Sequence, residues 1–242
     1  MTDAHCHLSC GDESVREFIV GRDFFGMHPW EVIDGADVDA GAVAASLRER
    51  LLEQPSAGVG EIGLDRLKER NVPLAMREVF EAQLRLAIEL RRPVVLHGAK
   101  CWGQVVEAVG RLVKQAGASC DSQAFLFHGF SRSDGLIPDI VRLNGYISVG
   151  PAILNDHAVN YRALAKKIPA HRLLVETDRT EGNAAECPSV RDVLSKLAEI
   201  RGEDPAALES QTDANAARFR DAESAGTIQS HEMASKVLTS CL

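Results

Sequence analysis

The chain has 242 residues, 45% of them hydrophobic, which is enough for one large domain with a substantial core. Its 27 basic and 35 acidic residues give a formal charge of −8, which excludes a polycation that coats nucleic acid without selectivity. The six cysteines form no CxxC pair and are expected to be reduced thiols. We therefore expect a single cytoplasmic domain over residues 1–242, with no signal peptide, no membrane partner and a monomeric state, although the sequence leaves oligomerisation open.

The chain begins with two histidines, His5 and His7, that stand two residues apart. Because side chains alternate along a strand, both imidazoles of a strand would lie on one face, where they can bind one metal ion. The alternative is that one of them merely packs. The interpretation of this pair as a metal site is supported by the ends of the strands that follow it along the chain.

Strand-like and helical segments then succeed one another. The strand-like segments are residues 1–5, 17–20, 24–27, 57–65, 93–97, 124–128, 146–149 and 173–178. The helical segments are residues 38–52, 74–90, 104–115, 138–143, 158–168, 188–200 and 204–219. Apolar strands that alternate with helices predict a parallel sheet covered on the outside. Eight such strands predict an α/β fold of the (β/α)8 TIM barrel class, and the absence of a GxGxxG turn argues against an open doubly wound sheet.

The two ends of the chain depart from a regular barrel. Residues 8–23 are too few to hold the first two connecting helices, so we predict shortened first connections. After the third strand, Pro29 is expected to end regular structure and to leave His28 at the mouth. Extra helices follow the last strand, and residues 227–242 form a weakly amphipathic tail that we cannot assign a role.

Six side chains that can bind a metal fall at predicted strand ends: His5, His7, Glu61, His97, His128 and Asp178. In a barrel they converge at one mouth. Each alone could be structural, but an apolar strand tolerates a charge only when it is paired or coordinated. Four imidazoles and two carboxylates suffice for two divalent ions that share a carboxylate bridge. This mixed nitrogen and oxygen set suits Zn, Mn, Ni or Fe, whereas Mg prefers oxygen.

Short motifs around these residues strongly resemble those of the TatD-type metal-dependent deoxyribonucleases, which belong to the amidohydrolase-like TIM barrels. They are Asp3-Ala4-His5-Cys6-His7, Gly26-Met27-His28-Pro29, Gly60-Glu61-Ile62-Gly63-Leu64-Asp65, Pro93-Val94-Val95-Leu96-His97, His128-Gly129-Phe130-Ser131, Glu176-Thr177-Asp178 and Asn215-Ala216-Ala217-Arg218-Phe219. The resemblance runs in order from residue 3 to about residue 219. It implies a binuclear metal hydrolase that cleaves phosphodiester bonds in DNA, with Mg²⁺ as the family's usual ion.

The resemblance also implies roles for single residues. His5, His7 and Asp178 would hold one ion, His97 and His128 the other, and Glu61 would lie between them. A bound metal can lower the pKa of water from 15.7 to about 7, which supplies a hydroxide for attack on phosphorus. Asp178, with Glu61 as a second candidate, would orient or deprotonate that water.

Three further residues are candidates for contacts with the substrate. We place His28 beside the substrate phosphate, its alternative role being packing between Pro29 and Trp30. Lys100 and Arg132, which follow two ligand positions, could supply positive charge, although exposed basic residues are usually only solvated.

Departures from the family's motifs lie around the substrate and leave the ligand set intact. Ala99 stands where the family usually has Arg, Arg132 follows Ser131 in place of Gly, and Arg179-Thr180 replace Ser-Pro. Two alternatives therefore stay open: hydrolysis of another ester, lactone or amide, and a metal-retaining binding protein without catalysis. Against the first, Glu61 stands where many such hydrolases carry a modified Lys; against the second, all six ligands are retained.

Overall fold

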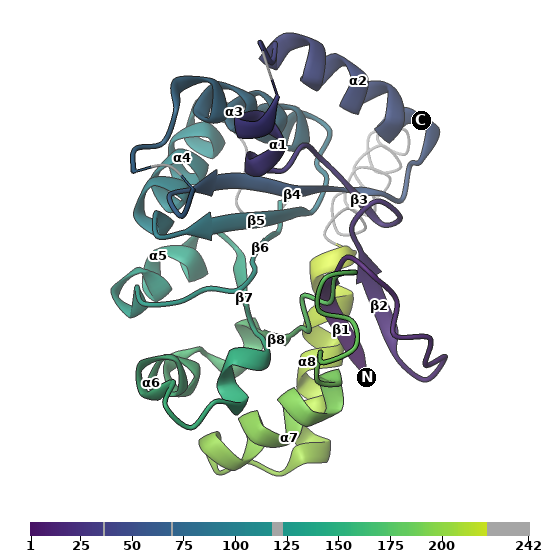
Figure 1. Ribbon diagram of the computed structural model, residues 1–242, viewed down its shortest axis with the longest axis vertical. Coiled ribbons are helices and arrows are strands. Elements are labelled where there is room, and N and C mark those ends of the chain that lie inside the picture. Colours follow the sequence, from purple (N-terminus) through teal and green to yellow (C-terminus); the bar gives the residue numbers. More distant parts are fainter. Residues whose placement is uncertain (36, 69, 118–122, 222–242) are drawn as a thin grey trace, which may run out of the picture.

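A computed structural model describes residues 1–35, 37–68, 70–117 and 123–221 of the chain (Figure 1). The tail over residues 227–242 lies outside this range. None of the helices in the described residues is long and apolar enough to cross a membrane.

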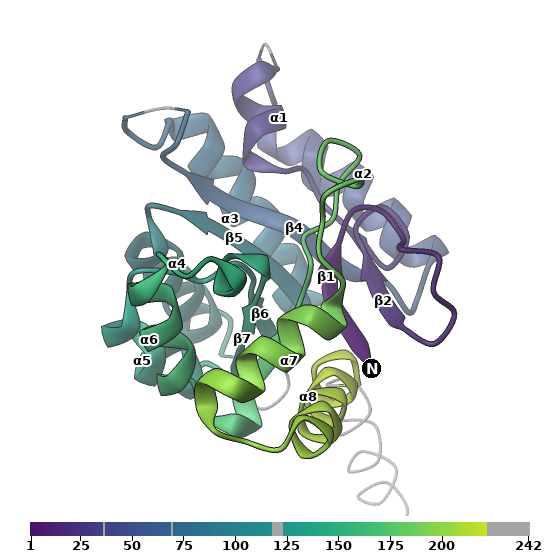
Figure 2. The ribbon, with the colours of Figure 1, turned by 60° about the horizontal axis from the view of Figure 1, so that its bottom comes forward.

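In the described part of the chain, eight parallel strands form the centre of the molecule, in the order of the sequence (Figures 1 and 2). They are β1 (Thr2–Cys6), β2 (Arg16–Ile19), β3 (Phe24–Phe25), β4 (Gly58–Asp65), β5 (Val94–Ala99), β6 (Phe125–Phe127), β7 (Gly145–Val149) and β8 (Leu173–Val175). Strands β1 and β2 pair with each other, β3 to β8 pair as a six-stranded sheet, and a bridge between Val20 and Phe24 joins the two groups. All eight predicted strands are confirmed.

The first and last strands meet through backbone hydrogen bonds beyond their ends. The Asp178 N–H donates to the His5 carbonyl at 3.0 Å, and the N–H groups of His7 and Leu8 both donate to the Arg179 carbonyl. The buried carboxylate of Asp3 strengthens this seam, because it accepts from the N–H and the hydroxyl of Thr177 at 3.0 and 2.6 Å. The strands therefore close into the barrel that the sequence predicts.

Eight α-helices accompany the strands within the described residues. They are α1 (Pro29–Asp34), α2 (Ala40–Glu53), α3 (Leu74–Glu89), α4 (Trp102–Gln115), α5 (Ile137–Arg142), α6 (Val159–Lys167), α7 (Val190–Arg201) and α8 (Pro205–Arg220). Most of them lie around the outside of the strands (Figure 2), where buried apolar residues of helices and strands form one continuous cluster. No helix joins β1 to β2 or β2 to β3, so the prediction of shortened first connections is confirmed.

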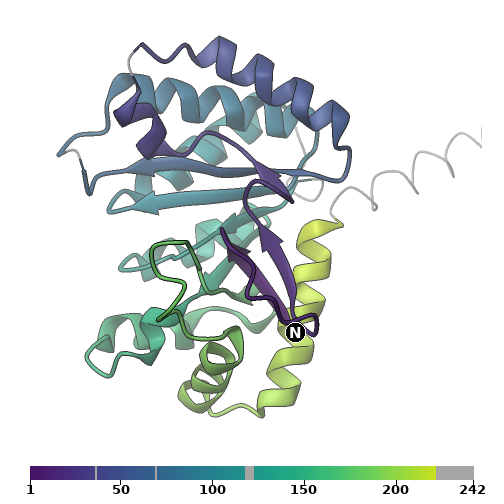
Figure 3. The ribbon, with the colours of Figure 1, turned by 45° about the vertical axis from the view of Figure 1, so that its right-hand side comes forward.

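Helix α8 closes the barrel at the end where the strands begin (Figure 3). Its Phe219 is fully buried, stacks on Phe24 of β3 with ring centroids 5.8 Å apart, and contacts Tyr146 of β7. Next to it, Arg220 donates to the carbonyls of Asp23 and Ser56, just before β3 and β4. Since this end is filled by side chains, the opposite mouth is left for chemistry.

The expectation that Pro29 ends regular structure is wrong. Pro29 is the first residue of α1, where a proline costs no hydrogen bond because the first N–H groups of a helix have no partner inside it. His28 is the N-cap: its Nδ1 accepts from the Trp30 N–H at 3.1 Å, and the Glu31 carboxylate accepts from the His28 N–H at 2.8 Å. The helix therefore fixes the direction in which the His28 ring points.

Candidate metal centre

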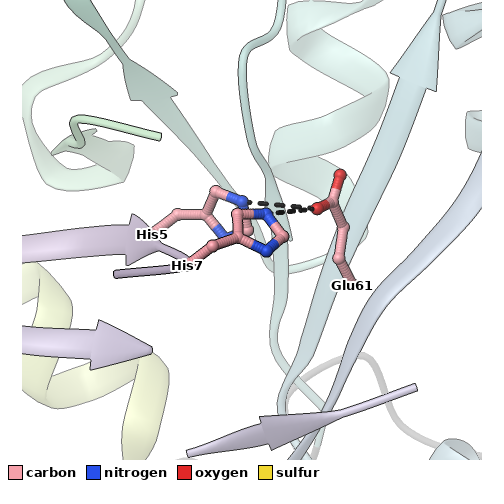
Figure 4. A group of neighbouring side chains, drawn as sticks. All are labelled: His5, His7 and Glu61. Carbon is pink, nitrogen blue, oxygen red and sulfur yellow. Dashed lines mark hydrogen bonds and ion pairs between the residues drawn. The ribbon is translucent and has the colours of Figure 1, made fainter. Parts of the chain in front are cut away.

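Strands β1 and β4 bring three of the predicted ligands together at the mouth. His5 lies near the end of β1, His7 follows that strand, and both imidazoles point at Glu61 of β4 (Figure 4). The Nε2 atoms of His5 and His7 lie 3.5 and 3.1 Å from Glu61 Oε2. His5 and Glu61 are buried, whereas one third of the His7 side chain is exposed.

The second oxygen of Glu61 faces a different set of imidazoles. Oε1 lies 2.6 Å from His97 Nδ1 on β5 and 2.6 Å from His128 Nε2, which follows β6. His28 Nε2 lies 3.5 Å from the same oxygen. Glu61 therefore separates two groups of histidines, one at each of its oxygens.

Asp178 completes the set from the end of β8. Its Oδ1 lies 3.5 Å from His5 Nε2 and 3.7 Å from His7 Nε2, and it also forms a compact group with His5 and His128. The side chain is half exposed, unlike that of Glu61. Its backbone φ of 49° is unusual for a residue other than glycine and directs the carboxylate toward the mouth.

The donor set fits a divalent cation. His5 Nε2 is buried and has no hydrogen-bond partner among the described residues, although carboxylate oxygens of Glu61 and Asp178 each lie 3.5 Å away. A buried nitrogen without a partner is costly. A cation placed between the nitrogen and the two oxygens would satisfy all three atoms, so the residues present suit a metal.

The electrostatics of the cluster point the same way. Burial alone would raise the pKa of Glu61, but the charge and hydrogen bond of His128, with His28 and His5, hold this pKa well below its usual range. Burial and His128 would lower the pKa of His5, yet the carboxylates of Asp178 and Glu61 raise it to about 9. The carboxylates of Glu61 and Asp178 are thus stabilised by nearby positive charge, which protons or metal ions can supply.

Sequence reasoning assigned no role to Asp65, which the structure places behind His97. Asp65 is fully buried, and its Oδ2 lies 2.9 Å from His97 Nε2 and accepts from Trp30 Nε1 at 2.8 Å. Burial would raise the pKa of Asp65, but His97, the Leu67 N–H and Trp30 lower it to about 2. The ionised carboxylate fixes the ring so that Nδ1 faces Glu61, a common arrangement behind metal ligands.

The predicted substrate residues lie in different surroundings. His28 belongs to the cluster itself, with its ring 4.7 Å from that of His97 and at right angles to it. It also contacts the ring of Trp30, so both roles considered for it are compatible with the geometry. Lys100 and Arg132 lie outside the cluster, on the wall of a cavity that also reaches His97, His128 and Asp178.

Comparison with known proteins identifies the family. Residues 20–221 match the family described as TatD related DNase. The chain is 32% identical to the 3′-5′ ssDNA/RNA exonuclease TatD of Cronobacter sakazakii, over 80% of this chain and 74% of that protein. It is 27% identical to the uncharacterized metal-dependent hydrolase YabD of Bacillus subtilis, over 86% and 80% of the two chains.

Solved structures show the same fold. The TatD homologue YJJV of Escherichia coli superposes with a TM-score of 0.66 at 23% identity, over 87% of this chain and 77% of that one. A TatD family hydrolase of Entamoeba histolytica gives 0.64 at 14% identity, over 85% and 75%. The resemblance drawn from the motifs is thus confirmed, and the chain belongs to the TatD related DNase family of hydrolases.

Proposed function

We propose that this protein is a phosphodiesterase that uses two divalent metal ions and removes nucleotides from the 3′ end of single-stranded nucleic acid, DNA being the expected substrate. The observation that carries the proposal is the position of Glu61, whose two oxygens face separate groups of imidazoles at the mouth of a TatD-family barrel. The relative named 3′-5′ ssDNA/RNA exonuclease supports the choice of substrate and of end.

The proposed ligands divide between two ions. His5, His7 and Asp178 would hold one, His97 and His128 the other, and Glu61 would bridge them. Ions held there would lower the pKa of water and offset the negative charge that develops on the phosphoryl oxygens. The identity of the ions is left to experiment, since Mg²⁺ is expected from the family and Zn²⁺ or Mn²⁺ from the nitrogen ligands.

Asp178 is the best placed residue to take a proton from the attacking water. Its carboxylate is half exposed and lines both cavities at the mouth, so that water and substrate can reach it. Glu61 is buried and lies within 2.6 Å of two imidazoles, which leaves it less free to exchange protons with solvent. We therefore assign the role of base to Asp178 and that of bridge to Glu61.

The substrate phosphate would lie against basic residues at the edge of the cluster. Arg132 and Lys100 have no carboxylate within ion-pair distance among the described residues, so their charges are available to an anion. The imidazole of His28 would line the side of the cluster next to His97. Arg132, Lys100 and His28 would together take the place of the arginine that the family usually carries at the position of Ala99.

The first experiment combines metal content with nucleotide release. The protein is stripped with a chelator, reloaded with Mg²⁺, Mn²⁺ or Zn²⁺, and incubated with single-stranded DNA. We expect two ions per chain and nucleotide release only after reloading. Bound metal without cleavage of DNA or RNA would overturn a nucleic-acid substrate and direct the search to other esters and lactones.

Replacement of the proposed base separates catalysis from binding. Asp178→Asn should lower kcat by about 10² to 10⁴-fold, which is the usual range for loss of a general base. Metal content of the variant is measured in parallel, because Asp178 is also a proposed ligand. Asp139→Asn is the matched control and should leave kcat unchanged, because this exposed carboxylate on α5 pairs, among the described residues, only with Arg142 on its own helix. An active Asp178→Asn enzyme would refute the assignment.

A further inference from the structure

Two cavities meet at the metal centre, and they differ in charge. The larger, about 770 Å³, extends from the ends of β5 and β6 toward Arg66 and Trp102. The smaller, about 540 Å³, extends under the start of α6. Gly129, Ser131, Arg132 and Asp178 line both, so the loop after β6 forms the boundary between them.

The larger cavity is cationic. Arg66, Lys100 and Arg132 line it, and Asp178 at the metal centre is its one carboxylate among the described residues. None of the three basic side chains is within ion-pair distance of a carboxylate in the described part of the chain. Unpaired cations along a groove are what the backbone of a single strand requires, since each nucleotide carries a phosphate.

The smaller cavity has no basic Lys or Arg of its own. Apart from the shared Arg132, its lining includes two carboxylates, Glu176 and the shared Asp178, and the hydroxyls of Ser131 and Thr177. The rest of its polar and apolar side chains are amides, an imidazole, a phenol and apolar groups, among them Asn160, Asn183, His157, Tyr161, Pro151, Ala152 and Val159. Val159 is 67% exposed although it is apolar. Amide groups can pair with the edge of a base and apolar groups can cover its face, so this lining suits an uncharged heterocycle and sugar.

A carboxylate lies at the back of the smaller cavity. Glu176 is 1% exposed; its Oε1 accepts from the Gly129 N–H at 2.7 Å and its Oε2 accepts from the Ser148 hydroxyl at 2.5 Å. The Tyr161 hydroxyl accepts from the Gly150 N–H at 2.9 Å. The other titratable groups that line the cavity are His157, Tyr161 and Asp178, so nothing in this lining beyond Arg132 offers a fixed positive charge.

We propose that the smaller cavity binds the terminal nucleoside and that the larger one carries the phosphates of the remaining strand, with Arg132 beside the phosphate between them. The inference rests on the proposed function and assigns a direction to the substrate. A 3′-terminal nucleoside with a free hydroxyl has no phosphate beyond the one that is cleaved, so it needs no cation. A terminal phosphate would bring a charge of about −1.5 to −2 toward Glu176.

The test compares oligonucleotides of one sequence that differ only at their ends. A 3′-phosphate in place of the 3′-hydroxyl should lower kcat/KM at least tenfold, whereas a 5′-phosphate should leave it unchanged. Equal rates on the 3′-hydroxyl and 3′-phosphate strands would overturn the inference alone. Failure to cleave any strand, with bis(p-nitrophenyl) phosphate still hydrolysed, would overturn the proposed substrate and this inference with it.

Variants of the two cavities should separate their roles. Asn160 is exposed on the first turn of α6. Asn160→Lys should restore cleavage of the 3′-phosphate strand at least threefold, and Asn160→Gln should not. Lys100→Gln should raise KM for a ten-nucleotide strand more than for a dinucleotide and should not change the ratio between 3′-hydroxyl and 3′-phosphate strands. A changed ratio in Lys100→Gln, or no rescue in Asn160→Lys, would contradict the proposed direction.

Discussion

At the scale of single residues, His97 is held from both sides by carboxylates, Glu61 at Nδ1 and Asp65 at Nε2. Asp65→Asn keeps the shape of the side chain but removes the charge that orients the ring. We expect this change to weaken metal binding about 10- to 100-fold, the usual effect of losing such a partner. Titration of the stripped protein with metal measures it, and rescue of activity by excess metal would support a positioning role. Unchanged affinity would show that Glu61 alone orients the ring.

The position of Asp65 could have been found from the sequence. Glu61, Gly63 and Asp65 alternate along one strand, so a period of two places both carboxylates on the same face as the predicted ligand. The donation from Trp30 to Asp65 could not be found in this way. It depends on α1, a helix of six residues whose N-cap is a histidine, and histidine is not among the residues that usually signal a helix start.

At the scale of elements, β4 and β5 approach each other most closely at Gly63. Gly63 of β4 pairs with His97, and a Cβ at Gly63 would lie 2.0 Å from the His97 carbonyl oxygen. The backbone φ of +157° is also one that other residues rarely adopt. Gly63→Ala should therefore displace the strand that carries His97, with loss of stability and of metal affinity together.

We expect Gly63→Ala to lower the free energy of unfolding by about 1 to 3 kcal/mol, the range for a forced backbone conformation. Chemical denaturation of the metal-free protein measures the change without the contribution of bound ions. Gly110→Ala in α4 is the control, because its added Cβ meets only Leu143 at an ordinary 3.7 Å and should stabilise the helix by about 0.5 to 1 kcal/mol. Similar effects of the two substitutions would contradict the role given to Gly63.

Most elements follow from periodicity, because continuously apolar strands between amphipathic helices are typical of a parallel α/β architecture. The sequence predicts all eight strands and seven of the eight described α-helices, with ends that shift by one to three residues. The sequence does not predict the left-handed backbone at Lys100, Arg132 and Asp178, since none of the three is a glycine. These conformations are imposed by the packing of the mouth, which a local pattern does not record.

At the scale of the whole molecule, a net charge of −8 gives nucleic acid no general attraction to the protein. Binding should therefore depend on the few cations of the larger cavity, Arg66, Lys100 and Arg132. With three phosphate contacts, the slope of log K against log salt should be about −2 for a single strand. Anisotropy titrations with a non-cleavable oligonucleotide measure it. Arg66→Gln should reduce the slope by about 0.7, and an unchanged slope would place the strand elsewhere.

The seam between the first and last strands also sets when the centre can exist during synthesis. His5 and His7 are synthesised more than 170 residues before Asp178, which donates its N–H to His5. A growing chain therefore holds an incomplete set of proposed ligands until Asp178 has been added. If the proposed activity is correct, the nuclease stays inactive toward the mRNA from which it is translated until Asp178 has been added.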